Sequence, residues 1–154
     1  TMLIDVSNGL CTTAKALSMK WHTVMNVICK DEYIPAIQVR RFVQEIRDTC
    51  QRVQEFVVYT NALHHCNLAQ SPSIVVGVNI YNDAVRISSS LEELKSFVDK
   101  HVTLVGEDED QFEGVLNEID DTLLRLMYAG EYLQKGDLRS ALETLSDAQN
   151  PVLE

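Results

Sequence analysis

Apolar residues recur along most of this chain at alternating spacings of three and four. The pattern is clearest from Ala36 to Gln70, a stretch of 35 residues that contains neither Gly nor Pro. Its regularly spaced apolar or small residues are Val39, Val43, Ile46, Cys50, Val53, Val57 and Thr60. Residues three and four apart lie on one side of an α-helix, so this stripe predicts one buried face opposite a charged, solvated one. A helix of this length measures about 50 Å, and only comparably long neighbours can cover its stripe.

The same spacing places the remaining helices. We expect helices at about 8–30, 36–70, 72–105, 111–135 and 138–149. The predicted fold is all-α, an antiparallel bundle of four long helices plus a short C-terminal fifth helix. A chain of 154 residues buries roughly two thirds of its unfolded surface, enough for a single domain over residues 1–154. Pro35 and Pro72 suit first-turn positions of the second and third helices, with Ser71 as the cap before Pro72.

The segment 74–87 has two interpretations. Its β-branched residues and the Asn82-Asp83 pair are typical of a β-hairpin. The apolar positions continue to Val102 at helical spacing, however, and a hairpin here has no third strand to pair with, so a helix is favoured. Residues 88–90 are three serines, and Glu93 follows the last of them in the pattern of a capping box. This pattern allows a kink or a break of the third helix near 88–90.

Composition excludes several classes of protein. The hydrophobic fraction is 45% and the mean hydropathy is near zero, as in ordinary soluble domains. No stretch approaches the roughly 20 apolar residues that cross a bilayer, and no basic segment leads into an apolar run at the N-terminus. We expect no membrane insertion and no signal peptide.

The four cysteines show no paired CxxC spacing, and each lies within or beside a predicted apolar face, where free Cys behaves as a small hydrophobe. In an antiparallel pair of helices, Cys29 and Cys66 are tens of ångströms apart, whereas a disulfide needs Cα atoms within about 7 Å. Cys11 and Cys50 are expected to lie closer together, displaced from each other by about one helical turn along the helix axes. Reduced cysteines in a cytoplasmic protein are the prediction.

Charge is distributed unevenly. Residues 1–70 carry a net charge of +1 and residues 71–154 carry −11. The acidic run Glu107, Asp108, Glu109 and Asp110, followed by Glu113, fits a solvated helix start, where the macrodipole favours acids. It also fits a docking surface for a basic partner. Nucleic acid is not expected as a partner, because phosphate contacts need a positive surface.

Trp21 is the only tryptophan and lies on the apolar stripe between Leu17 and Val24. Core packing is the favoured interpretation. The alternative is an exposed aromatic anchor for a partner, so Trp21 joins the five acidic residues as a candidate partner-binding residue.

The segment from Tyr132 to Leu145 contains Gly136-Asp137 followed by a small residue, Ala141. It resembles the turn of a tetratricopeptide-type helical hairpin, and similar hairpins occur in subunits of vesicle-tethering complexes. The match covers about 25 residues and occurs once, whereas repeat arrays need about three units. Arg125 stands where the repeat has a large apolar residue. We interpret the segment as a common way of joining two helices, which also allows the chain to be part of a longer helical protein.

No motif demands a particular chemistry. His64, His65 and Cys66 are adjacent, so they point in different directions on a helix and do not converge on a metal. The acidic run lacks the Gly and ligand spacing of a calcium loop. His22 and His101 are not followed by the Lys-Gly pair associated with phosphotransfer domains. We expect no catalytic residue, no metal and no cofactor.

The functional prediction is a non-enzymatic protein-protein interaction or scaffolding module. It would bind a partner helix or peptide in an inter-helix groove, with the acidic second half selecting basic flanks. A ligand- or metal-binding bundle, phosphotransfer-type or enzymatic, with an internal pocket is the alternative. Self-association through the stripe of the 36–70 helix also remains open.

Overall fold

The computed structural model describes residues 2–28, 39–64 and 72–149, and this part of the chain is all-α. The helices are α1 (Met2–Ile28), α2 (Val39–Ala62), α3 (Ser73–His101), α4 (Glu107–Gln134) and α5 (Leu138–Gln149). The prediction of four long helices plus a short C-terminal fifth is confirmed.

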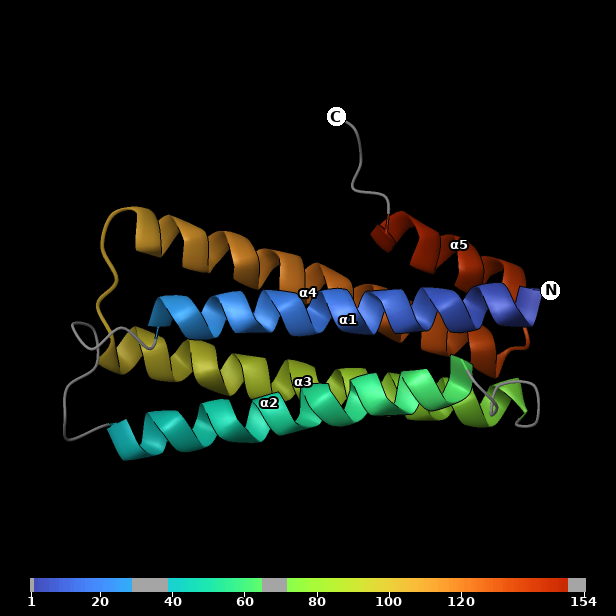
Figure 1. Ribbon diagram of the computed structural model, residues 1–154, viewed down its shortest axis with the longest axis horizontal. Coiled ribbons are helices and arrows are strands. Elements are labelled where there is room, and N and C mark those ends of the chain that lie inside the picture. The colour runs from blue at the N-terminus through green and yellow to red at the C-terminus, as the bar shows by residue number, and fades with distance from the viewer. Residues whose placement is uncertain (1, 29–38, 65–71, 150–154) are drawn as a thin grey trace.

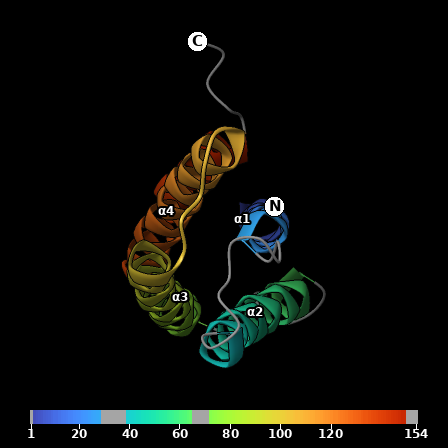
Figure 2. The ribbon, with the colours of Figure 1, turned by 90° about the vertical axis from the view of Figure 1, so that its left-hand side faces the viewer.

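Consecutive long helices run antiparallel, and α1 also packs against α4, so that the four enclose one interior (Figure 1). Viewed along the bundle, α3 and α4 form one continuous wall, with α2 beside α3 and α1 on the inner side (Figure 2). The short helix α5 turns back and packs against both α1 and α4. Helix α1 therefore contacts three other helices and provides much of the core.

The core is built from the apolar stripe of each helix. Its largest fully buried side chains are Trp21, Phe42, Phe56, Leu10, Leu17, Ile28, Ile80, Ile87, Leu91, Leu94, Ile119 and Leu123. Each such side chain stabilises the fold by roughly 1.5–3 kcal/mol relative to an exposed one. The rings of Phe42 and Phe97, 5.3 Å apart between centroids, join α2 to α3. These contacts hold the bundle together by apolar burial along its whole length.

Helices α3 and α4 make their closest approach at a pair of glycines. A Cβ added at Gly77 would lie 2.5 Å from the carbonyl oxygen of Gly130 and 2.7 Å from the backbone nitrogen of Gln134. A Cβ added at Gly130 would lie 2.9 Å from the carbonyl oxygen of Gly77. Two backbones can approach this closely only where both side chains are hydrogen atoms, so the glycines define where the two helices cross.

The turn between α4 and α5 satisfies the backbone groups of both helix ends. Gly136 adopts a φ of 74°, and its N–H donates to the carbonyl of Leu133 (3.1 Å). The N–H of Asp137 donates to the carbonyl of Tyr132 (2.9 Å), which completes a Schellman motif. The Asp137 carboxylate then accepts from the backbone N–H of Ser140 (3.1 Å) and from its hydroxyl (2.7 Å), which caps α5. The segment that resembles a tetratricopeptide turn thus joins two helices that pack together.

Several expected helix limits are wrong. Helix α1 begins at Met2 rather than near residue 8, because Val6 and Leu10 already belong to its buried face. Helix α3 begins at Ser73 with Pro72 as its N-cap, and it ends at His101 rather than near 105. Helix α4 begins at Glu107 rather than near 111. Pro35 and Ser71, expected at the starts of two helices, lie outside the described residues.

Helix α3 is continuous, so the break that the sequence allows near 88–90 does not occur, and residues 74–87 are helical. The hydroxyl of Ser90 donates to the carbonyl of Arg86 (3.1 Å) and accepts from the guanidinium of Arg52. Because the buried hydroxyl is satisfied inside the helix, it does not need to cap a new one. The strand-like signal arises because β-branched residues occupy both sides of α3. Val76, Ile80 and Ile87 are buried, and the exposed ones are Ile74, Val75, Val78 and Val85.

The described cysteines, Cys11 and Cys50, are free thiols at different levels of the bundle. Cys11 contacts Asn61, with Sγ donating to Oδ1 at 2.9 Å, whereas Cys50 is level with Trp21. Residues 11 and 21 are about 15 Å apart along the axis of α1. Cys11 and Cys50 are therefore displaced by more than the one helical turn expected. Cys29 and Cys66 lie outside the described residues.

Candidate functional site

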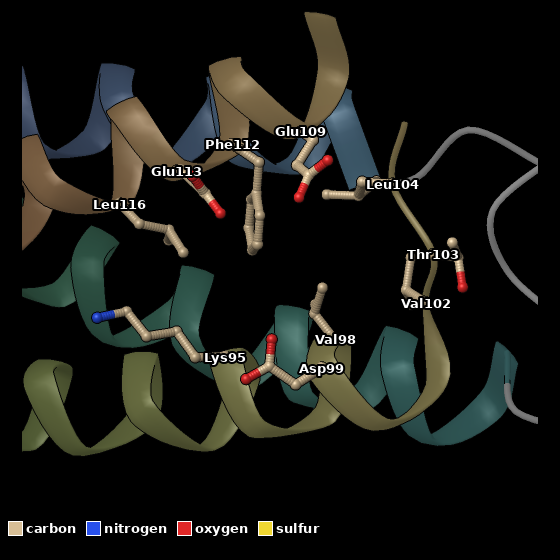
Figure 3. A pocket seen from close by; sticks show the side chains of 10 residues that line it. All are labelled: Lys95, Val98, Asp99, Val102, Thr103, Leu104, Glu109, Phe112, Glu113 and Leu116. Carbon is tan, nitrogen blue, oxygen red and sulfur yellow. The ribbon is translucent and has the colours of Figure 1, made fainter. Parts of the chain in front are cut away.

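The candidate site is a groove between the second half of α3 and the first half of α4, hereafter the α3–α4 groove. The two helices touch at Gly77 and Gly130 and separate toward the 102–106 connection at the other end of the bundle (Figure 1). A cavity of about 340 Å³ lies between them on this side (Figure 3). Its size falls at the lower end of the range for ligand pockets.

The floor of the groove is apolar. It is formed by Val98, Val102, Leu104, Phe112 and Leu116. Four of these side chains also belong to the buried core, while Leu104 is half-buried. The ring of Phe112 extends from α4 into the space between the helices (Figure 3). The groove therefore offers a firm apolar surface held in place by the packing beneath it.

The rim of the groove is acidic. Asp99 on α3 and Glu109 and Glu113 on α4 are exposed and line the cavity. Their carboxylates point from the two walls toward the space beside Phe112 (Figure 3). Within the described part of the chain, none of these three carboxylates has an ion pair or a side-chain hydrogen bond. The groove thus presents negative charge that the described residues do not neutralise.

Lys95 is the cationic residue of the groove lining, and it is already paired. Its ammonium donates to Asp120 on α4 (2.6 Å) and to Glu92 one turn earlier on α3 (3.2 Å). Partial burial lowers the pKa of Lys95, but the hydrogen bonds and charges of Asp120 and Glu92 outweigh burial and raise the pKa above its ordinary value. Lys95 stays charged at neutral pH, joins the two walls, and leaves the three rim carboxylates uncompensated.

The acidic residues expected to bind a partner divide into two groups. Glu107, Asp108, Glu109 and Asp110 all lie in the first turn of α4, where the helix dipole favours acids. Only Glu109 of these lines the groove, together with Glu113 one turn later. Glu109 is therefore both a first-turn residue of α4 and part of the groove lining.

Trp21, the other candidate, lies on α1, is 1% exposed and packs against α2. Its indole N–H points to the sulfur of Cys50 (3.1 Å), which also contacts the sulfur of Met25 (3.0 Å). Burial raises the pKa of the Cys50 thiol, and the hydrogen bond from Trp21 opposes this only in part. The interpretation of Trp21 as a surface anchor is corrected, because its apolar neighbours on the stripe draw the ring into the core.

Asp99 and the apolar floor were missed by sequence reasoning. Lys95 and Asp99 are four residues apart on one helix, and so are Glu109 and Glu113 on the next. These spacings signal two charged stripes. Only the way the two helices pack shows that the stripes face each other across Phe112.

The histidines do not form a site within the described chain. The described residues include no group of three or more His, Cys, Asp or Glu side chains able to hold a metal ion. His101 packs against Phe97, with ring centroids 4.8 Å apart, and His22 is exposed. His65 and Cys66, expected beside His64, lie outside the described residues.

Comparison of the chain with protein-family models, curated proteins and solved structures finds no match. Among the described residues, none of the helices has the combination of length and apolar character needed to span a bilayer.

Proposed function

We propose that this chain is a non-enzymatic protein-interaction or scaffolding module of a larger cytoplasmic assembly. It binds a helical or peptide segment of a partner protein in the α3–α4 groove, and the acidic rim selects partners with basic residues beside an apolar face. The observation that carries the proposal is the combination of an apolar floor with three uncompensated carboxylates on facing walls.

The size of the cavity supports binding of a protein segment. About 340 Å³ holds a few side chains, so a partner would insert anchors while the rest of its segment lies along the two helices. Charge on the rim would speed the encounter with a basic segment and disfavour an acidic one. These properties suit a surface that recognises a short segment of another protein.

The interior of the bundle supports a binding role over catalysis. The buried polar residues within the described chain carry hydroxyl groups: Ser7, Thr13, Thr49, Thr60, Ser90 and Thr122. An acid–base enzyme places titratable groups in a cleft with strongly shifted pKa values, whereas these buried hydroxyl groups do not titrate near neutral pH.

The free thiols Cys11 and Cys50, used as packing residues, support a reducing compartment.

The proposal is tested by selecting peptides on the immobilised chain. A phage library of random peptides of about 16 residues is selected at low salt, about 50 mM NaCl, where surface charge is weakly screened. The enriched peptides are expected to combine apolar residues with Lys or Arg. They should bind the Glu109→Gln/Glu113→Gln variant at least about tenfold more weakly, a loss of roughly 1.4 kcal/mol.

The matched control is the Asp110→Asn/Glu118→Gln variant. It also removes two negative charges from α4, but from exposed positions that do not line the groove. Binding should therefore stay within about twofold of the wild type. Failure to enrich any peptide, or equal loss of binding in both variants, would show that the groove is not the recognition surface.

A further inference from the structure

We infer that the side chain entering the α3–α4 groove is an arginine of the partner segment. This inference rests on the proposed function and names the residue that the groove recognises. It is carried by the facing carboxylates and by the apolar floor between them, of which the buried ring of Phe112 is part.

The rim provides acceptors on two sides. Asp99 approaches from α3, whereas Glu109 and Glu113 approach from α4 (Figure 3). A guanidinium carries five N–H donors in a planar fork and can donate to carboxylates on both walls at once. The ammonium of a lysine is a compact charge with three donors, and it matches such a divided set of acceptors less well.

The floor accommodates the rest of the side chain. The aliphatic stem of an arginine can lie on Leu104 and Leu116 while its charged head stays at the rim, which is how long cationic side chains cover apolar surface. The ring of Phe112 is only 6% exposed, so it adds apolar surface to the floor beneath the carboxylates and does not present an open stacking face. The groove therefore complements both parts of an arginine side chain.

An apolar anchor fits less well. Covering the floor with a leucine-sized side chain would also remove water from the neighbouring carboxylates without giving them a partner. Leaving a charged group desolvated and unpaired is unfavourable. Lys95 does not relieve this, because its ammonium is already held by Asp120 and Glu92. An arginine supplies the missing positive charge as it fills the groove.

The inference is tested with four small probes, the N-acetyl amides of arginine, citrulline, lysine and norleucine. Each is titrated into the ¹⁵N-labelled chain, and backbone amide shifts are followed at about 50 mM NaCl. Citrulline has nearly the shape of arginine without its charge, and norleucine supplies an apolar stem alone. We expect saturable shifts at residues 98–116 with arginine, several-fold weaker binding of lysine, and at least about tenfold weaker binding of citrulline and norleucine.

The variants locate the effect. Glu109→Gln/Glu113→Gln should lower the affinity for the arginine probe about tenfold, while Asp110→Asn/Glu118→Gln should leave it within about twofold. Equal binding of norleucine or lysine, arginine shifts spread over the acidic surface, or no saturable shift would overturn the inference.

These results are separable from the proposed function. Should enriched peptides bind the groove through a leucine, arginine is the wrong anchor and the interaction module stands. Should peptide selection also fail, both the anchor and the module are rejected.

Discussion

The two glycines at the crossing of α3 and α4 act through the absence of a side chain. The two atoms nearest to a Cβ added at Gly77 are backbone atoms of α4, which cannot rotate away as the third neighbour, the side-chain Cγ of Gln134, can. Any larger residue at Gly77 must move the two helices apart at their crossing. The same residue type has another meaning at Gly114, which is exposed on α4 with no atom within 4 Å of an added Cβ.

We predict that Gly77→Ala destabilises the protein by about 2 kcal/mol, because overpacking outweighs the gain in helix propensity. Gly114→Ala is the matched control and should stabilise by up to about 1 kcal/mol. Urea denaturation followed by circular dichroism measures both. A neutral or stabilising Gly77→Ala would show that the helices are not in backbone contact there.

Asp137 is a second residue whose role is local. Its carboxylate accepts two hydrogen bonds from Ser140, which lower the pKa of Asp137 below its ordinary value. The folded state thus favours the charged carboxylate. This contribution to stability is complete above the ordinary pKa, about 3.9, and is lost as the pH falls through the lowered folded-state pKa.

We therefore expect Asp137→Ala to lower the urea midpoint at pH 7, because α5 loses its N-cap. The difference from wild type should narrow as the pH falls below about 4. Asp137→Asn is the control, since asparagine also caps helices and should retain most of the stability without the pH dependence. A difference that does not change between pH 7 and pH 3 would contradict the role of the charged carboxylate.

At the scale of helices, sequence periodicity predicted which segments are helical, and local motifs predicted their ends poorly. The helical spacing of apolar residues correctly predicted a helix over 74–87 despite the β-branched residues, because Val76, Ile80 and Ile87 lie on one buried face of that helix. The serines at 88–90 look like a helix start in sequence. Their actual role depends on Arg52 of α2, a contact between helices that no local pattern reveals.

The continuity of α3 can be measured by hydrogen exchange. We expect the amides of residues 88–91 to exchange as slowly as those of 84–87, because both stretches lie inside one helix with buried faces. Native-state exchange followed by NMR gives residue-level protection. Protection at least about tenfold lower across 88–91 would indicate a local break and contradict the continuous helix.

At the scale of the whole molecule, the formal net charge of −10 is the dominant electrostatic feature. Repulsion between acids opposes the compact state, and added salt screens it. Ion pairs such as Lys95–Asp120 weaken in salt, but exposed or partly exposed pairs contribute little to stability. Added salt should therefore stabilise the protein, because screening of the repulsion outweighs the weakening of the ion pairs.

We expect the free energy of unfolding at pH 7 to rise by about 1 kcal/mol when NaCl increases from about 20 mM to about 500 mM. Urea denaturation at the two salt concentrations measures this change, and sucrose at matched osmolality is the control for excluded-solute effects. Lower stability at high salt would mean that specific ion pairs outweigh the net repulsion.

The candidate site was only partly predictable at this scale. The sequence identified Glu109 and Glu113 through their charge. Asp99 drew no notice because it belongs to a different helix, and its proximity depends on how α3 is placed beside α4. Trp21 was ambiguous for a similar reason, since only the contact with Cys50 of α2 shows that its ring is enclosed.

The crossing at the two glycines also determines how far apart α3 and α4 lie at the groove. Asp99 lies 22 residues beyond Gly77, which is about 33 Å along a helix. A rotation of α3 by about 3° around the crossing would move the rim by about 1.7 Å over that length. The width of the groove therefore depends on Gly77 and Gly130 at the opposite end of the bundle. A substitution there, far from any bound partner, can change which side chains fit into the groove.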